Sequence, residues 1–231
     1  MPVYTYTPLD DPAALPGTTQ AYGINTSGQI VGSYSLGAHK DYGFLYSGGT
    51  YTTLIDPASA QETFADGIND GGQVVGFYLD ASGLARHGFF YNGTTYTTID
   101  DSLGINGTTA EGINNAGQIV GFFLDGNRKS HGFFYSGGIY STIDGPSGAQ
   151  GDYASGINNT GHIVGTYFDA NGMAPPGTDV GRKSAFVCLV GMQVQHGKFV
   201  RVDPIEPGTF DCDGNKPTLA FSIDAAAEYH G

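Results

Sequence analysis

The sequence predicts an all-β fold made of repeats, and three observations support this: the glycine content, the aromatic content and a motif that recurs along the chain. Glycine provides 38 of the 231 residues, tyrosine 15 and phenylalanine 14, whereas charged residues make up 13%. Glycine tolerates the positive φ of tight turns and aromatic residues favour strands, so this balance is typical of many short strands joined by turns. A chain of this length suits one domain around a continuous core.

The recurring motif is G-I-N-x-x-G-x-[IV]-V-G, which occurs four times without gaps. Its copies start at residues 23, 67, 112 and 156, so they lie 44, 45 and 44 residues apart. Each copy is followed by a hairpin loop, an [HYS]-[GA]-F segment, a turn and a strand that ends in an aspartate. This spacing matches the four-stranded blades of a β-propeller.

A fifth, degenerate copy predicts how the ring closes. Ser222-Ile223-Asp224 aligns with Gly156-Ile157-Asn158, after which the sequence ends within the repeat, and residues 3–10 resemble the last strand of a blade. Termini that share a blade leave no exposed sheet edge. We therefore expect a five-bladed β-propeller as a single domain over residues 1–231. Its repeats lie near 20–56, 64–100, 109–144 and 153–203, and its closing blade combines 218–231 with 3–10.

The G-I-N-x-x-G-Q-I-V-G and H-G-F-x-Y motifs resemble those of the HAF-repeat family of extracellular bacterial proteins, over nearly all of the chain. The resemblance implies a β-propeller located in the periplasm or outside the cell, and it implies no activity. The sequence departs from the pattern at Ser184-Ala185-Phe186, which replaces H-G-F, and in the fifth copy. A site repeated identically in every blade is therefore not expected.

The charge balance excludes some partners. Nine basic and 22 acidic residues give a net charge of −13, which opposes binding to nucleic acid or to an anionic membrane surface. No apolar run approaches the roughly 18 residues needed to span a bilayer. We expect a monomer that binds a small molecule or a carbohydrate, with no nucleic-acid or membrane partner.

The fourth repeat predicts where a ligand binds. Strand counting places the N-x-x-G turns on one face and the longer loops and crossings on the opposite, top face. The fourth repeat has 22 extra residues, 16 of them in two adjacent top-face connections. Irregular loops on a regular scaffold often carry function. The leading site therefore lies over blades 4 and 5, and the expected ligand contacts are Tyr22, Asp152, Tyr153, Asp169, Asp179 and Arg182.

A second candidate site lies on the innermost strands. The residue before each G-I dipeptide varies, although the motif that follows it is constant. It is Tyr22, Asp66, Glu111 and Ser155 in the four repeats. Such variation fits either the lining of a pocket or a solvated channel. If the protein is an enzyme, Asp66 and Glu111 are candidate catalytic carboxylates and Asp152 and Asp169 are further acidic candidates. His87 and His131 are the candidate catalytic histidines.

The repeated polar residues also have structural interpretations. Asn25, Asn69, Asn114 and Asn158 are expected to close tight turns, with a ring of metal ligands as the alternative. The aspartates at the ends of the fourth strands are expected to form turns or to bond to a repeat histidine; they are Asp10, Asp56, Asp100, Asp144 and Asp203. Hydrogen bonds to Asp100 and Asp144 would give His87 and His131 a structural role.

One segment has the composition of a calcium loop. Asp211, Asp213 and Asn215 alternate around Gly214, and oxygen ligands at a glycine bend suit calcium. The segment lacks the rest of a twelve-residue calcium loop, so an ordinary Asp/Gly turn is the alternative. Cys188 and Cys212 permit a disulfide without implying one.

Two classes of function remain open. The first is a binding module for a small molecule or glycan. The second is a calcium-assisted hydrolase, such as a lactonase or glycosidase, or a polysaccharide lyase, because propeller enzymes collect carboxylates from several blades without a linear motif. The sequence contains no G-x-S-x-G, P-loop, H-E-x-x-H or C-x-x-C motif, which disfavours the familiar hydrolase, nucleotide and zinc classes.

Overall fold

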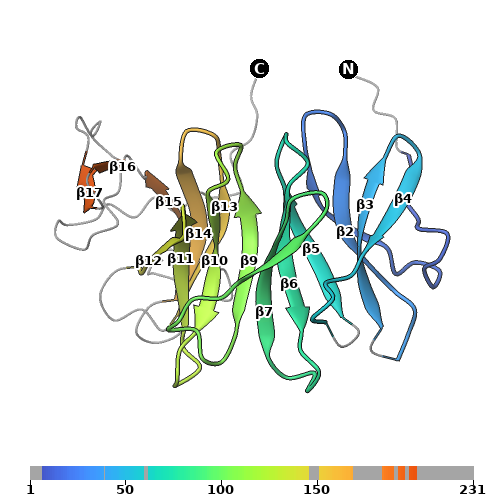
Figure 1. Ribbon diagram of the computed structural model, residues 1–231, viewed down its shortest axis with the longest axis horizontal. Coiled ribbons are helices and arrows are strands. Elements are labelled where there is room, and N and C mark those ends of the chain that lie inside the picture. Colours follow the sequence, from blue (N-terminus) through green and yellow to red (C-terminus); the bar gives the residue numbers. More distant parts are fainter. Residues whose placement is uncertain are drawn as a thin grey trace. The chain divides into compact units, whose positions relative to one another are not determined.

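The computed structural model describes residues 7–38, 40–59, 62–145 and 151–168, together with the backbone of three later strands. These residues form strands and turns and contain no helix, which confirms the all-β prediction (Figure 1). No stretch of the described chain forms an apolar helix of bilayer-spanning length. The expected closing blade falls outside the described residues, except for residues 7–10.

Three sheets contain four antiparallel strands each, in chain order. The first contains β1 (Gln20–Ile24), β2 (Ile30–Ser35), β3 (Asp41–Ser47) and β4 (Thr50–Leu54). The second contains β5 (Thr63–Ile68), β6 (Val74–Leu79), β7 (Arg86–Tyr91) and β8 (Tyr96–Ile99). The third contains β9 (Thr108–Ile113), β10 (Ile119–Leu124), β11 (Ser130–Ser136) and β12 (Ile139–Ile143).

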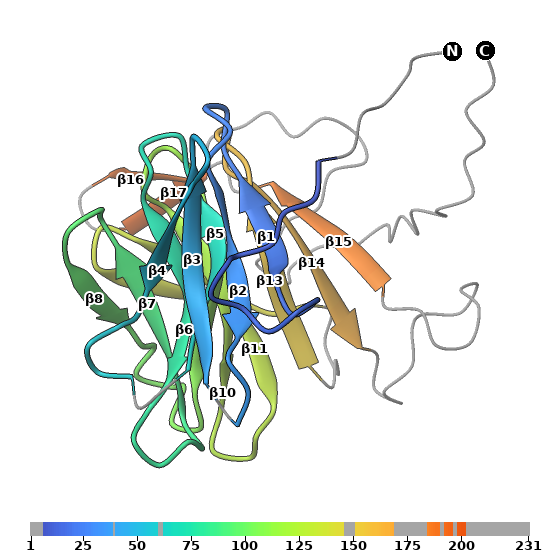
Figure 2. The same ribbon diagram turned by 90° about the vertical axis from the view of Figure 1, so that its right-hand side faces the viewer.

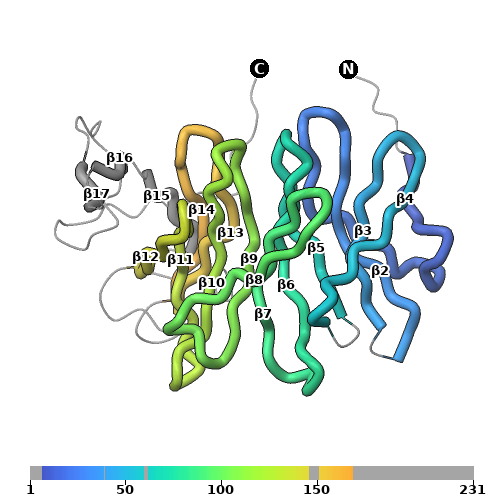
Figure 3. Tube along the Cα trace, in the orientation of Figure 1, coloured from blue at the N-terminus to red at the C-terminus, as the bar shows by residue number. Residues whose placement is uncertain are grey.

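The fourth repeat begins in the same way. Its described strands β13 (Gly151–Ile157), β14 (His162–Phe168) and β15 (Ser184–Leu189) pair in order, and β16 (Met192–Gln195) pairs with β17 (Lys198–Arg201). Figures 2 and 3 let the reader follow the chain back and forth within one sheet before it enters the next. This four-stranded meander is the blade topology expected from the 44-residue repeat.

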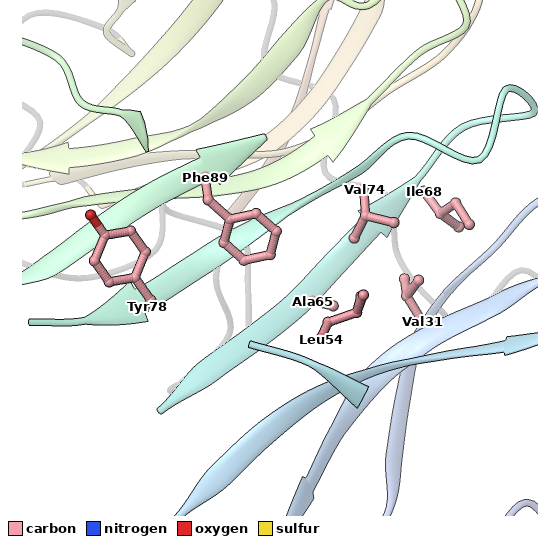
Figure 4. Close-up of a cluster of buried hydrophobic side chains, with 7 residues drawn as sticks. All are labelled: Val31, Leu54, Ala65, Ile68, Val74, Tyr78 and Phe89. Atoms are coloured by element: carbon pink, nitrogen blue, oxygen red, sulfur yellow. The ribbon is translucent and has the colours of Figure 1, made fainter. Parts of the chain in front are cut away.

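The chain divides into two compact units, Met1–Asp100 with Gly107–Ala110 and Asp101–Asn106 with Glu111–Gly231. In the first unit a hydrophobic cluster joins Val31 and Leu54 of the first sheet to residues of the second, among them Val74 and Phe89 (Figure 4). In the second unit a cluster joins Val120, Phe134 and Ile143 to Ala154 and Ile163. Neighbouring sheets within a unit therefore share a core, as blades of a propeller do.

Two glycines of the motif are required by geometry. Gly72 closes the turn between β5 and β6 at φ +75°, a conformation that L side chains rarely adopt. Gly76 lies on β6 opposite Ala65, where the pairing shifts at a bulge before Gly67. A Cβ at Gly76 would collide with the carbonyl oxygen of Phe64. The fixed glycines thus serve the turn and the close approach of two strands.

The motif asparagine closes the same turn, as expected. The Asn69 side-chain oxygen accepts hydrogen bonds from the backbone N–H groups of Gly71 and Gln73, each at 3.0 Å. Its amide nitrogen donates to the Gln73 side chain at 2.7 Å. The turn-closing interpretation of the four asparagines is therefore confirmed at this position, and Asn25, Asn114 and Asn158 make equivalent bonds.

The asparagines also link neighbouring repeats. Asn25 Nδ2 donates to the backbone oxygen of Asn69 at 3.0 Å, and Asn114 Nδ2 donates to that of Asn158 at 3.0 Å. Because Asn25 and Asn114 are nearly fully buried, these bonds lie inside the packed structure. One amide side chain therefore closes its own turn and holds the turn of the next repeat.

The strand register corrects the predicted series of aspartates. Gly43 pairs with Leu54 on β4, and Gly88 pairs with Ile99 on β8. Asp56, two residues after Leu54, is thus equivalent to Asp101 and not to Asp100. Asp56 and Asp101 are buried and accept backbone hydrogen bonds from residues two positions later, whereas Asp100 and Asp144 are exposed. The single predicted series is wrong, because it combines a buried turn position with an exposed one.

Candidate functional site

A pocket of about 480 Å³ lies in the first unit, where the innermost strands of the first two sheets approach each other. A Cβ at Gly23 on β1 would lie 3.1 Å from the carbonyl oxygen of Asp66 and 3.5 Å from the Cα of Gly67 on β5. This close approach brings Tyr22 and Asp66 to the same pocket. The lining is completed by side chains of the second sheet, and its residues are Tyr22, Glu62, Phe64, Asp66, Phe77, Leu79, Gly83, Leu84 and Arg86.

Strand β5 and the residue before it supply alternating side chains to one wall. Glu62, Phe64 and Asp66 are two residues apart, and all three line the pocket. Phe64 is the cross-strand partner of Phe77 on β6. Their rings stack with centroids 4.6 Å apart and planes 13° from parallel. The wall is an aromatic stack that has a carboxylate on either side along the strand.

A positive charge of the chain lies over this stack. Arg86, the first residue of β7, places its guanidinium carbon 4.7 Å from the centroid of the Phe77 ring. Arg86 is exposed, whereas Phe64 and Phe77 are half-buried. The quadrupole of an aromatic ring attracts a cation at such a distance. The ring therefore positions the guanidinium at the edge of the pocket.

Hydrogen bonds also hold the Tyr22 phenol in the pocket lining. Its hydroxyl donates to the Gln20 side chain at 2.8 Å and accepts from the Ser33 hydroxyl at 3.2 Å. The side chain nevertheless remains 47% exposed. A ring that is both exposed and held in place is suited to contact a ligand, because little conformational entropy is lost on binding.

The loop between β6 and β7 forms the rim. The Asp80 carboxylate accepts hydrogen bonds from the backbone N–H and the hydroxyl of Ser82, and the hydroxyl bond is the main cause of a lowered pKa for this carboxyl. A backbone hydrogen bond from Asp80 to Ala85 closes the loop. Leu84 at its tip is 86% exposed. The rim therefore presents an apolar side chain from a hydrogen-bonded loop.

The structure brings two of the predicted residues together and separates the others. Tyr22 and Asp66 line the pocket, as one interpretation of the variable position before G-I proposes. Glu111 occupies the equivalent position on β9, where it is half-buried, and does not line this pocket. Ser155 at the same position of β13 is exposed.

His87 and His131 each bond to an aspartate at the end of the neighbouring strand. His87 Nδ1 lies 2.6 Å from Asp100 Oδ2, and His131 Nδ1 lies 2.8 Å from Asp144 Oδ1. The expected histidine–aspartate hydrogen bonds are thus present in both blades. The first repeat has Tyr42 at the histidine position and a hydrophobic residue at the aspartate position, so both members of the pair change together.

Asp152 and Tyr153 both take part in packing. Asp152 is fully buried and accepts a hydrogen bond from the Gly145 backbone N–H, and burial raises the pKa of its carboxyl. The Tyr153 ring packs edge-on against Phe122 of the third sheet, with centroids 4.6 Å apart. Both residues therefore contribute to the contact between β13 and its neighbours within the second unit.

The leading predicted site over blades 4 and 5 falls mainly outside the described residues, and so do the remaining predicted positions. These are Asp169, Asp179, Arg182, Asp211, Asp213 and Asn215, with Cys212 and the side chain of Cys188. Within the described part of the chain, no group of three or more histidine, cysteine or acidic side chains is arranged to hold a metal ion.

Sequence reasoning missed the aromatic stack and the cation. Phe64 corresponds to Gln20, Thr109 and Tyr153 in the other repeats, so it lies outside the shared motif. Arg86 likewise differs from its counterpart in every other repeat. The available signal was the residue pattern over 62–66, where an aromatic residue lies between two acidic residues at alternate positions.

No family model and no curated protein matches the sequence. Among solved structures, the β-propeller domain of the Trilobed protease from Pyrococcus furiosus is similar at 12% identity and a TM-score of 0.47, over 91% of this chain and 55% of that one. This chain thus spans about half the length of that structure.

Two further structures are similar over part of the chain. A fucose lectin from Kordia zhangzhouensis, in complex with methyl-fucoside, has 12% identity and a TM-score of 0.35 over 54% of this chain and 96% of its own. A Hadza microbial sialidase has 11% identity and a TM-score of 0.43 over 75% of this chain and 44% of its own. The TM-scores are below 0.5, so the propeller assignment depends on the four-stranded sheets and the repeat themselves.

Proposed function

We propose that this chain is a binding module for a small carbohydrate, which it holds in the pocket lined by Tyr22 and strands β5–β7. The observation that carries the proposal is the Phe64–Phe77 stack, which has acidic side chains on both sides. A sugar has an apolar C–H face and a rim of hydroxyls. An aromatic wall can pack against the face, and carboxylates and a guanidinium can bond to the hydroxyls.

The dimensions of the pocket agree with a ligand of this class. Its volume of about 480 Å³ lies within the roughly 300–1,000 Å³ typical of small-molecule sites. The walls combine aromatic and aliphatic side chains with a few polar groups, as such sites usually do. A monosaccharide or disaccharide unit is the ligand that this mixture of surfaces favours.

The aromatic stack of this pocket is specific to the second repeat. At the positions of Phe64 and Phe77, the first repeat has Gln20 and Ser33 and the third has Thr109 and Phe122. We therefore propose a single site on the second blade in place of one site in every blade. The leading site expected over blades 4 and 5 remains a prediction, because Asp169, Asp179 and Arg182 lie outside the described residues. The calcium-assisted hydrolase or lyase also remains a prediction, because the expected calcium ligands Asp211, Asp213 and Asn215 lie outside them as well.

We further propose that the five-bladed ring closes through shared termini and that the protein acts in the periplasm or outside the cell. The G-I-N and H-G-F motifs support both statements through their resemblance to HAF-repeat proteins. An exported location would give the protein access to the glycans of cell surfaces and of the environment.

Saturation-transfer NMR with a panel of monosaccharides, followed by a glycan array, tests the function. A matched pair of rim variants tests the site. Leu84→Arg places a long side chain at the pocket mouth, and Leu103→Arg makes the same change at a turn position that is 60% exposed and outside the lining. We expect Leu84→Arg to weaken binding about tenfold or more, a loss of about 1.4 kcal/mol, and Leu103→Arg to have no effect.

Two results would refute the proposal. One is a protein that binds no carbohydrate in either assay while its circular dichroism spectrum shows folded β-structure. The other is a sugar that binds equally well to the wild type, to Leu84→Arg and to Phe64→Leu, because such a ligand would occupy a different surface.

A further inference from the structure

We infer that Gln20 and Ser33 are positioning residues for Tyr22, and that they leave its hydroxyl able only to accept, so that the pocket selects a sugar with a free hydroxyl at this point. This inference rests on the proposed function and adds to it a rule of ligand selection. It follows from the bulge in β1, from the burial of Ser33 and from the hydrogen bonds of the phenol.

The first observation is that Tyr22 lies at a β-bulge. The register of β1 against β2 shifts between Ala21 and Gly23, and Tyr22 is the residue between them. The extra residue of a bulge is not held by the strand ladder, and bulges re-aim side chains next to binding sites. The direction of the Tyr22 ring therefore depends on the contacts of its own side chain.

The second observation is the use of the Ser33 hydroxyl. Ser33 is only 5% exposed, and a buried hydroxyl destabilises a fold unless it forms a hydrogen bond. In the described part of the chain, this hydroxyl bonds to that of Tyr22, to which it donates at 3.2 Å. An alanine would fill the same place without needing a partner. The serine therefore serves the phenol, and the fold itself does not require it.

The third observation is that the first repeat differs from the others at these positions. Gln20 and Ser33 are cross-strand partners, and in the second repeat their positions hold the stacked pair Phe64 and Phe77. None of the other three complete motifs has a tyrosine at the position of Tyr22. The first blade thus has a polar pair where the second has two rings, and this pair holds the ring beside it.

The hydrogen bonds also determine what the phenol can offer to a ligand. A tyrosine hydroxyl has one donor and two acceptor lone pairs. The donor is directed to Gln20 Oε1 at 2.8 Å, and one lone pair accepts from Ser33 Oγ. One lone pair remains, on a side chain that is 47% exposed. A ligand hydroxyl can donate to it, whereas a fluorine or an ether oxygen at the same carbon cannot.

Titration calorimetry with D-glucose, D-galactose and D-mannose tests the positioning role. Ser33→Ala should weaken the binding of the tightest of these hexoses about three- to tenfold, because the ring must then be ordered on binding. Ser33→Thr should retain most of the affinity, since it keeps the hydroxyl and Thr166 occupies this position in the fourth repeat. In a Tyr22→Phe background, Ser33→Ala should cause no further loss.

A matched control removes a hydroxyl that bonds to a different tyrosine of the same sheet. Thr53 Oγ1 lies 2.9 Å from the Tyr34 hydroxyl oxygen, and neither residue lines the pocket. Thr53→Val should therefore leave the affinity for all three hexoses unchanged.

NMR of the protein with ¹³C-labelled tyrosine measures the positioning without a ligand. Tyr22→Phe identifies the Cζ signal of Tyr22 by its loss. Ser33→Ala and Gln20→Met should each shift this signal, because they remove hydrogen bonds of its hydroxyl. Thr53→Val should shift the signal of Tyr34 and leave that of Tyr22 in place.

Monodeoxyfluoro analogues of the bound hexose test the rule of ligand selection. Each replaces one hydroxyl by fluorine, which is similar in size and cannot donate. We expect one analogue to bind the wild type about three- to tenfold more weakly than the parent sugar does. The same analogue should bind Tyr22→Phe as tightly as the parent sugar, because that variant has no acceptor to satisfy.

The outcomes separate this inference from the function on which it rests. If none of the three hexoses binds, the carbohydrate site and the selection rule fail together, and the Tyr22 signal alone decides whether Gln20 and Ser33 hold the ring. If a hexose binds equally well to the wild type and to Ser33→Ala, the site stands and the positioning role is refuted. If every fluorinated analogue affects the wild type and Tyr22→Phe alike, the selection rule is refuted.

Discussion

The carboxylate of Asp152 accepts a hydrogen bond from the backbone N–H of Gly145 at 2.8 Å, and in this pair the carboxylate belongs to the acceptor residue, whereas in the second repeat it belongs to the donor residue. In the second repeat the backbone N–H of Asp56 donates to the Thr63 hydroxyl at 3.3 Å. Asp56 corresponds to Gly145, and Thr63 to Asp152. Each of these connections between neighbouring sheets therefore contains one buried carboxylate, from Asp56 in the second repeat and from Asp152 in the fourth.

This exchange predicts strong coupling between the two positions. Gly145→Asp would place a Cβ 2.6 Å from Asp152 Oδ1 and a second carboxylate in the same buried space, so it should destabilise the fold by about 2–4 kcal/mol. Asp152→Thr should change stability by less than about 1 kcal/mol, since the Thr hydroxyl can still accept from the backbone. Urea unfolding measures both changes.

The double variant completes the test. Gly145→Asp with Asp152→Thr restores the arrangement of the second repeat, and it should recover most of the stability lost in Gly145→Asp. The resulting coupling energy should be about 1–3 kcal/mol. Additive effects of the two substitutions would show that the positions do not share one carboxylate site.

The same carboxyl predicts a pH dependence. Burial raises the pKa of Asp152 above 3.8, and its Oδ2 is buried without a hydrogen-bond partner. Folding therefore favours the protonated form, so the stability from this carboxyl is largest when it is protonated and is lost as pH rises through the raised pKa. The stability of the wild type relative to Asp152→Thr should increase as pH falls from about 7 to 4, by about 1.4 kcal/mol or less per unit of pKa shift. Urea unfolding across this range measures the trend, and a relative stability that increases with pH would contradict it.

The histidine–aspartate pair should act as a structural unit. Asp100 bonds to His87 and also accepts from the Gly88 backbone N–H at 3.2 Å. Asp100→Ile alone should cost about 1–2 kcal/mol, because both bonds are lost. His87→Tyr combined with Asp100→Ile reproduces the residues of the first repeat, Tyr42 and Ile55, and should restore part of that loss in thermal unfolding.

The same double variant tests the predicted catalytic role of His87. A structural pair can be replaced without changing the affinity for sugar or any hydrolysis detected in a panel of lactones, esters and glycosides. Loss of such an activity from a folded double variant would instead assign His87 to catalysis.

Substitutions at Asn25 should separate the turn from the link between repeats. Asn25→Ala removes all its bonds and should cost about 2–3 kcal/mol, whereas Asn25→Asp keeps the acceptor for the Gln29 backbone N–H and loses the donor to Asn69. Thermal unfolding should rank the wild type first, Asn25→Asp second and Asn25→Ala last. Asn92→Ala, in an exposed turn with only local bonds, is the control and should have a small effect. Equal losses in Asn25→Ala and Asn92→Ala would mean that the link contributes nothing.

The blade architecture could be predicted because the same residues recur wherever the backbone adopts the same conformation. Gly72 and Gly76 are required by a turn and by a close approach, and Asn69 by the turn it closes, so each appears in every complete motif. A physical requirement repeated four times is visible in one sequence. The aspartates show where sequence comparison fails. Asp56 and Asp100 both follow a fourth strand in the sequence, but Leu54 pairs with Gly43 and Ile99 pairs with Gly88, so the two aspartates occupy different positions.

The pocket was less predictable because its residues are those in which the repeats differ. Tyr22 and Asp66 could be predicted, because they occupy the one variable position before the constant G-I-N motif. Phe64 becomes meaningful only through its pairing with Phe77, and Arg86 only through its position over that ring. Such neighbours on adjacent strands are far apart in the chain, and no periodicity along one strand reveals them.

Asn25 closes its own turn and bonds to the next one, so the two turns are coupled during unfolding. If one turn opens, its asparagine releases the carbonyl of the next turn at the same moment, so neighbouring blades lose protection together. Stacked repeats often unfold in steps, each with its own local free energy. Here the linked turns join the blades of each unit into one cooperative element, in which the amide hydrogens of Gln29 and Gln73 would exchange with solvent at matching rates.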